Sequence, residues 1–181
     1  MAKKKFEIKL TVKDLNKLKK QIENYRDNEL PKKLSELVEK LAEVGIPVIK
    51  QNIAEASFTY DENGIQSGAD TEHRTYVKVN SFTDYEEATL ILEGREVIFI
   101  EFGSGVYHNT SKGTSPHPLG KENEFLIGTY GLGNGARQVW GYYAESGELV
   151  LTHGVKATMP MYKADLEIIN NVVRIAREVF S

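Results

Sequence analysis

The stretch Val97-Ile98-Phe99-Ile100-Glu101-Phe102-Gly103-Ser104-Gly105 lies near the middle of the chain, and the predicted fold is built around it. Its first six residues are apolar on both faces of an extended chain, which is typical of a strand at the centre of a sheet. We therefore predict a central strand over residues 97–102. The glycines that follow predict that the chain leaves this strand directly into a loop.

That loop is unusually long and rich in glycine. From Gly103 to Gly147 the chain carries ten of its fifteen glycines. Long irregular segments are uncommon inside compact domains, and they usually carry function or become ordered when a partner docks on them. We predict a flexible arm over about residues 103–138, held out by a small regular scaffold. Such an arm favours a protein that assembles over one that catalyses.

Shorter strands are predicted on both sides of the central one. Residues 73–80 and 87–92 carry apolar side chains at alternate positions, as strands with one buried face do. Residues 139–143 and 149–151 form a predicted hairpin. Residues 5–12 also alternate strictly and predict an N-terminal strand.

Helical periodicity follows this N-terminal strand. Thr11 stands three residues before Asp14, which predicts a capping arrangement. Pro31 is placed as a first-turn residue of a second helix, whereas Gly45 and Pro47 are expected to break or kink that helix. The apolar residues at helical spacing in this region are Leu15, Leu18, Ile22, Tyr25, Leu34, Leu37, Val38, Leu41 and Val44.

The C-terminal segment gives the strongest helical pattern. Pro160 fits a first-turn position, and apolar side chains then recur at close to 3.6 residues. This stripe consists of Tyr162, Leu166, Ile169, Val173, Ala176 and Phe180, and it is widened by Met161, Ile168, Val172, Ile175 and Val179. A stripe this wide is either buried between two layers or partly reserved for a partner chain.

These elements predict an α+β fold. We expect one antiparallel β-sheet, packed on one side by the long N-terminal helical segment and the C-terminal helix, with the long glycine-rich loop attached. A length of 181 residues suits a single domain over residues 1–181.

Composition excludes several classes of function. The net charge of -3 is unlike that of a general nucleic-acid binder, so we expect no direct sequence-specific contact with nucleic acid. The absence of cysteine excludes disulfides, thiolate zinc sites and cysteine nucleophiles. No apolar run reaches the length of a membrane span, and no membrane partner is expected. We also expect no cofactor.

One alternative is a metal-dependent hydrolase that uses histidines of the loop. His108, His117 and His153 could form a composite site with Glu101. None of the histidines has the spacing of a metal-binding helix, so we interpret them as exposed loop residues. No catalytic or metal-ligating residue is therefore predicted.

A second alternative is a small binding module for carbohydrate or nucleic acid. Trp140, Tyr142 and Tyr143 could stack on sugars or bases. Few basic residues lie among them, which favours a packing role in the hairpin.

Several motifs are familiar in combination. A strand ending Glu101-Phe102-Gly103-Ser104-Gly105 is followed by an aromatic hairpin and by Thr152-His153-Gly154-Val155-Lys156-Ala157-Thr158-Met159-Pro160-Met161. Over most of residues 30–181 the chain resembles the neck and tail-completion proteins of lambda-like long-tailed phages, in the subgroup from phages and prophages of Gram-positive bacteria. Two segments depart from that family. Residues 60–65 replace a common Pro-x-x-Thr-Gly segment, and residues 159–162 lack the Phe of a common Pro-Phe-Met opening.

The resemblance implies a virion structural protein without enzymatic activity. It would be a head–tail connector or a tail-completion subunit that forms a ring at the phage neck. Its expected partners are other copies of itself and head-connector or tail-tube proteins. Its expected location is the virion, which is assembled in the cytoplasm of the bacterial host.

We expect two short segments to carry the structural roles of such a subunit. At the exit of the arm, Phe102 should pack inward, Gly103 should make a sharp turn and Glu101 should pair with a neighbouring group. Pro160, Met161 and Tyr162 should fix the start of the last helix.

Overall fold

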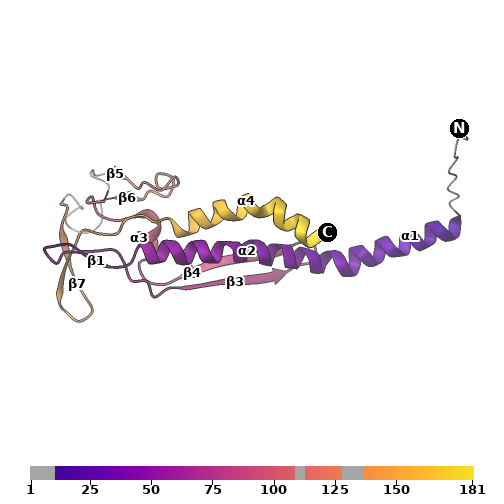
Figure 1. Cartoon of the computed structure of the whole chain (residues 1–181), viewed down its shortest axis with the longest axis horizontal. Coiled ribbons are helices and arrows are strands. Elements are labelled where there is room, and N and C mark those ends of the chain that lie inside the picture. Colours follow the sequence, from indigo (N-terminus) through magenta and orange to yellow (C-terminus); the bar gives the residue numbers. More distant parts are fainter. Residues whose placement is uncertain (1–10, 109–112, 128–136) are drawn as a thin grey trace, which may run out of the picture.

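The computed structural model describes residues 11–108, 113–127 and 137–181. It shows an elongated α+β fold, which confirms the predicted class (Figure 1). A helical rod consists of α1 (Val12–Asn24), the π-helical segment η1 (Tyr25–Glu29) and α2 (Leu30–Glu55). The C-terminal helix α4 (Pro160–Phe180) lies along one side of α2. The hairpin of β3 (Arg74–Ser81) and β4 (Glu86–Glu93) lies along the other side.

Two apolar clusters form the interior. The first lies where α2, α4 and β4 meet, and consists of Ile49, Ile53 and Ala164 with Val48, Leu90, Leu92 and Met161 around them. The second lies beyond the end of α2, and consists of Ala56, Ala69, Ile100 and Val155 with Phe99 against them. Both clusters join segments that are far apart in the sequence, so they hold the helical rod to the C-terminal half of the chain.

The start of the helical rod follows the predicted capping pattern. The side chain of Thr11 accepts the N–H of Asp14 at 3.2 Å, and the carboxylate of Asp14 accepts the N–H of Thr11 at 3.0 Å. Val12, which we predicted on a strand, is instead the first residue of α1. Thr11 is the cap of that helix, and residues 5–10 of the predicted strand lie outside the described residues.

The expected break at Gly45 and Pro47 is wrong. Helix α2 continues through both residues, although a proline in a helix interior costs about 3 kcal/mol. The reason is tertiary packing. A Cβ at Gly45 would stand 2.4 Å from a methyl carbon of Leu90 and 3.2 Å from the Cβ of Ala164. Glycine therefore lets α2 approach β4 and α4 closely, and burial of the same helix around Ile49 offsets the cost of Pro47.

The predicted central strand over residues 97–102 is also wrong, because this segment forms the short helix α3 (Val97–Phe102). Glu96 adopts a left-handed conformation with φ 63°, which turns the chain immediately before the helix. The N–H of Ile100 then donates to the carbonyl of Glu96 at 3.0 Å, and Ile100 is fully buried in the second cluster. The helix buries Ile100 and Glu101 while Ile98 stays exposed.

Over the described residues, the strands form three small sheets instead of the single predicted sheet. Strands β3 and β4 pair with each other in register from Arg74 opposite Glu93 to Ser81 opposite Glu86. The predicted C-terminal hairpin is confirmed as β7 (Trp140–Tyr143) and β8 (Leu149–Thr152). It belongs to a four-stranded sheet with β1 (Thr59–Tyr60) and β2 (Gln66–Ser67) in the order β1-β2-β8-β7. Strands β5 (Gly113–Thr114) and β6 (Leu126–Ile127) form the third sheet.

The described parts of the predicted flexible arm lie against the body of the protein. Residues 103–106 are buried, and so are Ser115, His117 and Gly120. Residues 109–112 and 128–136 of the arm lie outside the described residues. Over the described ranges, no helix combines the length and the hydropathy needed to cross a bilayer.

Candidate functional site

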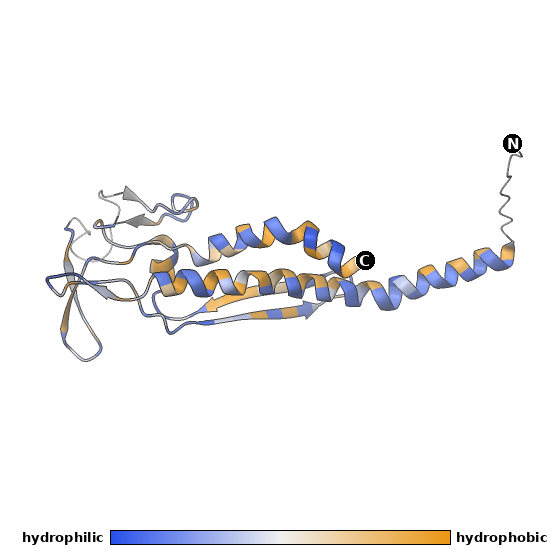
Figure 2. Cartoon of the chain, in the orientation of Figure 1, coloured by the Kyte–Doolittle hydropathy of each residue, from blue (hydrophilic) through white to orange (hydrophobic). Residues whose placement is uncertain are grey.

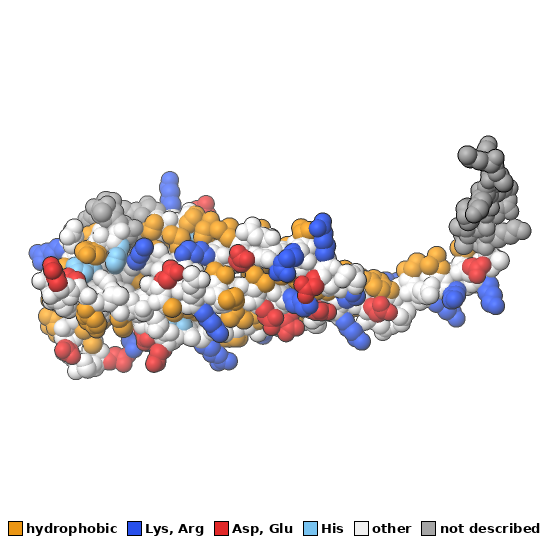
Figure 3. All heavy atoms as spheres, in the orientation of Figure 1, with side chains coloured by type: hydrophobic (Ala, Val, Ile, Leu, Met, Phe, Trp, Pro, Cys, Tyr) orange, Lys and Arg blue, Asp and Glu red, His pale blue; other side chains and the backbone are white. Residues whose placement is uncertain are grey.

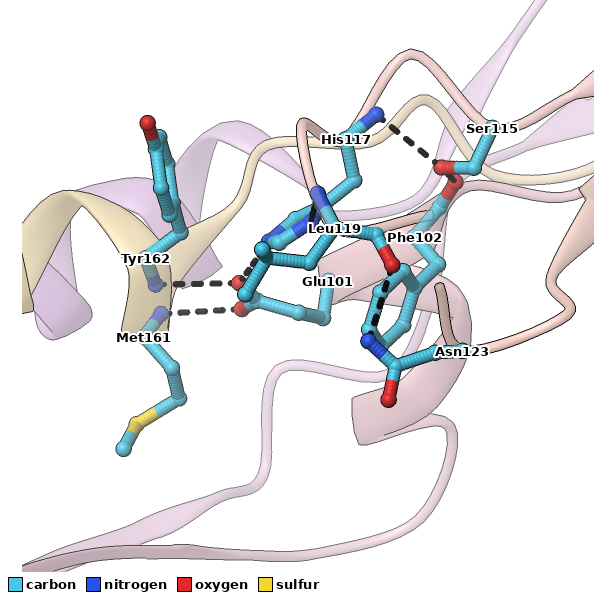
Figure 4. A network of polar contacts seen from close by, with 8 residues as sticks. All are labelled: Glu101, Phe102, Ser115, His117, Leu119, Asn123, Met161 and Tyr162. Atoms are coloured by element: carbon cyan, nitrogen blue, oxygen red, sulfur yellow. Dashed lines mark hydrogen bonds and ion pairs between the residues drawn. The ribbon is translucent and has the colours of Figure 1, made fainter. Parts of the chain in front are cut away.

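The strongest polar cluster of the described residues surrounds the carboxylate of Glu101 (Figure 4). Glu101 projects from α3 and is 7% exposed. Its Oε2 accepts the backbone N–H of Met161 at 2.8 Å, and its Oε1 accepts the N–H of Tyr162 at 3.0 Å. The first N–H groups of a helix have no partner within that helix. Glu101 therefore caps α4 from a position sixty residues earlier in the chain.

This cap replaces one that the local sequence does not provide. The residue before α4 is Met159, whose side chain makes no capping hydrogen bond and whose φ is 56°. A carboxylate is also favourable at this end of a helix, because the aligned peptide dipoles leave a partial positive charge there. The buried charge of Glu101 is thus stabilised by α4, and the first turn of α4 is fixed by Glu101.

His117 donates a third hydrogen bond to this carboxylate. Its Nδ1 accepts the backbone N–H of Leu119 at 3.0 Å, so that nitrogen carries no proton. The proton of the neutral ring is then on Nε2, which donates to Oε1 of Glu101 at 3.0 Å. The side chain of His117 is 5% exposed, so our interpretation of it as an exposed loop residue is wrong.

Phe102 and Ser115 attach the same loop to α3. The ring of Phe102 stacks on Phe125 with 4.7 Å between centroids and lies 4.5 Å from the ring of His117. The hydroxyl of Ser115 donates to the backbone carbonyl of Phe102 and accepts the N–H of His117 at 3.1 Å. Phe102 therefore packs inward against the loop of residues 113–127.

The six residues that the sequence singled out come together around this cluster. Pro160 is fully buried at the first turn of α4, and the edge of the Tyr162 ring faces His117 with 5.0 Å between centroids. Met161 packs on the first apolar cluster. Sequence reasoning placed His117 beside Glu101 only in the metal-site alternative, and it missed Ser115, which bonds to Phe102 and His117. Pro116 and Pro118 flank His117, and this pattern was a signal that the segment is a constrained turn.

Gly103 makes the sharp exit that we expected. Its φ of 81° and ψ of 160° lie in a region that is essentially restricted to glycine. The next residue, Ser104, then pairs with Val155, since the N–H of Ser104 donates to the carbonyl of Val155 at 2.8 Å and the N–H of Val155 donates back at 3.2 Å. Gly103 thus directs the chain from α3 into contact with the segment that precedes α4.

Substitution of Gly103 by valine should lower the free energy of unfolding by about 1–3 kcal/mol, because valine cannot adopt this backbone conformation without strain. We expect the chain to remain folded and its assembly to be hindered. Urea denaturation and electron microscopy of particles would measure the two effects. Gly147→Val is the matched control, because Gly147 also has a positive φ, of 82°, but has open space around it at a hairpin tip. Normal particle formation with Gly103→Val would contradict the assigned role.

A second buried histidine forms a separate site. Nδ1 of His153 faces the carbonyl of Gln138 at 3.0 Å, and Nε2 faces Oδ2 of Asp61 at 3.1 Å. The ring of Tyr107 stacks on His153 with 3.8 Å between centroids. His108, which contacts Tyr107 edge-on, has a buried Nε2 without a partner, and burial lowers its pKa. His117 pairs with Glu101 in the first site, so the composite metal site that we considered is divided between two places.

Within residues 11–108, 113–127 and 137–181, no three His, Asp or Glu side chains are grouped as metal ligands. The four histidines make hydrogen bonds or ring contacts of their own. The contacts of these histidines are structural, and the described residues do not come together as a set of metal ligands.

Asp61 should make the stability of its turn depend on pH. Hydrogen bonds from the N–H of Ile65 and then from His153 hold the pKa of Asp61 below its ordinary value, and the N–H of Asn63 adds to this. A lowered folded-state pKa stabilises the fold above the unfolded pKa of about 3.9, and this contribution is lost as pH falls through the folded pKa. The melting temperature should exceed that of Asp61→Asn at about pH 6, and the difference should shrink as the pH falls through the folded pKa. A constant difference would contradict this assignment.

A small cavity lies beside the C-terminal hairpin. Its volume is about 190 Å³, and its lining includes Phe99, Gln66, Trp140, Tyr142 and Thr152. Pockets for small organic ligands usually measure about 300–1,000 Å³. This cavity therefore suits one ring or one side chain better than an extended ligand.

Comparison with known proteins adds no relative. Neither a protein-family model, nor a curated protein, nor a solved structure matches this chain. Its function must therefore be inferred from its own residues and geometry.

Proposed function

We propose that this protein is a structural subunit of a tailed-phage virion without enzymatic activity. It acts at the neck, as a head–tail connector or a tail-completion subunit. It binds other copies of itself and head-connector or tail-tube proteins, and it is assembled into the virion in the cytoplasm of the bacterial host. The sequence motifs described above support the phage setting, and the exposed apolar surface of α1 supports the mode of action.

Helix α1 carries this proposal. None of its residues is buried, although apolar side chains line one of its faces (Figure 2). We call this face the α1 stripe; it consists of Val12, Leu15, Leu18, Ile22 and Tyr25, which are between 40% and 74% exposed. An isolated helix of thirteen residues is marginally stable in water, and an apolar stripe on a projecting helix marks a surface for a partner.

The rest of the fold holds α1 in a fixed direction. Helix α1 projects beyond the end of α4, away from the small sheets (Figure 1). The segment η1 joins it to α2 without a break, since the N–H of Leu30 donates to the carbonyl of Tyr25 in a π-helical turn. The buried interface between α2 and α4 then fixes the direction of the rod. The projecting helix α1 can therefore contact a neighbouring subunit that the other elements of the same chain do not touch.

The contacts of the Glu101 cluster also favour a structural role over a catalytic one. Its carboxylate accepts hydrogen bonds from two backbone N–H groups and from His117. A general acid, base or nucleophile needs to reach a substrate, and this group is 7% exposed and engaged within the chain. Its role is to fix the first turn of α4 and the loop of residues 113–127.

Electron microscopy of particles made without this protein tests the proposal. We expect filled heads without tails beside free tails, because the subunit that joins them is missing. Complete infectious particles would exclude a joining role. Particles with tails of abnormal length or with unfinished ends would assign the subunit to the tail side of the neck.

A second candidate function, a small binding module, is favoured only by the cavity beside Trp140. Trp140 is the only tryptophan, so its fluorescence reports on this site alone. A binding module would show a saturable change in Trp140 fluorescence with an oligomeric sugar or single-stranded DNA. The same titration with Tyr142→Ala, which alters the cavity wall, is the control. An unchanged spectrum would leave assembly as the only candidate.

A further inference from the structure

Helix α4 carries a second exposed apolar surface, on the side that faces away from α2. We call it the α4 stripe; it consists of Leu166, Ile169, Val173 and Phe180, which are between 38% and 61% exposed. The opposite side of α4 is buried against α2 through Ala164, Ile175 and Val179. Helix α4 therefore packs one apolar face against α2 and leaves its other apolar face exposed (Figure 3).

The α1 stripe and the α4 stripe begin with the same spacing. Leu15, Leu18 and Ile22 are separated by three and four residues, and Leu166, Ile169 and Val173 repeat that order; three residues further on, Tyr25 in α1 corresponds to the half-buried Ala176, which lies outside the α4 stripe. This is the spacing of the seam between two helices of a coiled coil. From Leu15 to Tyr25 the α1 stripe extends about 15 Å, and from Leu166 to Phe180 the α4 stripe extends about 21 Å. The shorter stripe fits within the longer one.

We propose that the α1 stripe of one copy packs in parallel orientation on the α4 stripe of a second copy. This inference rests on the proposed function and specifies the contact between subunits. It joins two different surfaces, so each copy offers one and receives the other. Contacts of this heterologous kind close into rings when the rotation between neighbours divides a full turn.

The same contact cannot form within one chain. The end of α4 lies beside Lys33, whose ammonium donates to the carbonyl of Val179. Leu18 precedes Lys33 by fifteen residues along the helical rod, which corresponds to about 22 Å. From Val179 the α4 stripe runs back in the opposite direction, along α2 (Figure 1). The α4 stripe of the same chain therefore cannot cover the α1 stripe, whereas that of a second molecule can.

Charge favours α4 over a second α1 as the partner. Helix α1 contains four lysines and two acidic residues, so two copies of α1 side by side would repel each other. Helix α4 contains three basic and three acidic residues. Pairing of α1 with α1 would also leave the α4 stripe bare in every copy.

Charge also favours the parallel orientation. Lys19 lies on one flank of the α1 stripe, and Asp165 lies on the flank of the α4 stripe that would face it when Leu15 is level with Leu166. In the antiparallel orientation, flanks of the same sign would meet. Lys19 would then lie on the same flank as Arg177, and this pairing of like charges costs free energy.

Cysteine cross-linking tests the contact, because the chain contains no native cysteine. The double variant Leu18→Cys/Ile169→Cys, concentrated and mildly oxidised, should give covalent dimers and longer ladders on a non-reducing gel. The single variants Leu18→Cys and Ile169→Cys should remain monomeric. A matched control, Lys20→Cys/Ile169→Cys, places its first cysteine on the opposite face of α1 and should cross-link at least tenfold less.

Three results would overturn the inference. Cross-linking of Leu18→Cys alone would show pairing of α1 with α1, cross-linking of the Lys20→Cys control to the same extent would show random collision, and no cross-link in the double variant would show that the two stripes do not meet. Light scattering of the unmodified chain separates these failures from failure of the proposed function. Oligomers without a Leu18–Ile169 cross-link would discard this contact and keep the assembly role.

Discussion

Replacement of Glu101 by alanine is expected to lower the free energy of unfolding by about 3–5 kcal/mol, because it removes one side of a buried, hydrogen-bonded cluster. The N–H groups of Met161 and Tyr162 lose their acceptor, and the Nε2–H of His117 is left buried without a partner. For a chain of this length the melting temperature should fall by roughly 6–20 °C. Thermal unfolding followed by circular dichroism would measure this fall.

Two further variants show whether the loss comes from the capping geometry. Glu101→Gln keeps one oxygen acceptor but turns an amide donor towards groups that also donate, so its stability should lie between that of Glu101→Ala and the parent chain. Glu178→Ala removes an exposed carboxylate that pairs with Lys40 at 3.2 Å, and should cost less than about 1 kcal/mol. Equal melting temperatures for Glu101→Ala and Glu178→Ala would contradict the capping role.

The parts of this fold that could be predicted from sequence are those fixed by neighbouring residues. The capping pair Thr11 and Asp14 lies three residues apart, and the hairpin of β7 and β8 depends on a turn of a few residues. The pattern of α4 repeats over six turns, so one misleading residue cannot change its interpretation. In each of these cases the interactions that decide the structure join residues that are close together in the sequence.

Residues 97–102 show why a short apolar run is ambiguous. Six residues that are apolar on both faces fit a buried strand or one and a half turns of helix equally well. The choice is made elsewhere, by the left-handed turn at Glu96 and by the space for Ile100 between Ala56 and Ala69. Ala69 and Ala56, which lie 31 and 44 positions before Ile100, therefore decide its local structure, and no local window includes either of them with Ile100.

The π-helical segment η1 changes which residues share a face of the helical rod. Tyr25 and Leu30 are five residues apart, a spacing that places them on different faces of a regular α-helix. The wider turn of η1 brings Leu30 back towards the face of Tyr25, because the N–H of Leu30 donates to the carbonyl of Tyr25. Pro31, placed at the first turn of a second helix, predicted an interruption at this point. The structure instead keeps the rod continuous from α1 through η1 to α2.

The candidate site was partly predictable for a related reason. Glu101, Phe102 and Gly103 were chosen for their place at the end of an apolar segment, and that choice is independent of whether the segment is a strand or a helix. His117 was interpreted as an exposed loop residue and placed beside Glu101 only in the metal-site alternative, because its hydrogen bond to Glu101 depends on how residues 113–127 fold back. The exposure of the α1 stripe was equally hidden, since its pattern is the same for a buried helix and for one that awaits a partner.

Introduction of two charges into the α1 stripe is expected to abolish assembly while the subunit remains as stable as before. Leu18→Glu/Ile22→Glu removes two apolar side chains from the proposed interface, each of which contributes about 1.5–3 kcal/mol when buried. The dissociation constant between subunits should therefore rise by about 10²–10⁴-fold. Stability should change by less than about 0.5 kcal/mol, because Leu18 and Ile22 are 50% and 59% exposed in the single chain.

The control for this variant places the same two charges on the other face of α1. Asn16→Glu/Asn24→Glu changes the net charge equally, and both asparagines are exposed and lie outside the α1 stripe. Sedimentation velocity of the three proteins over a range of concentration would measure association, and thermal unfolding would measure stability. Loss of association in both variants would assign the effect to charge alone. Retention in both would show that α1 is not the surface through which subunits bind, because a buried apolar seam cannot accept two unpaired carboxylates at its centre.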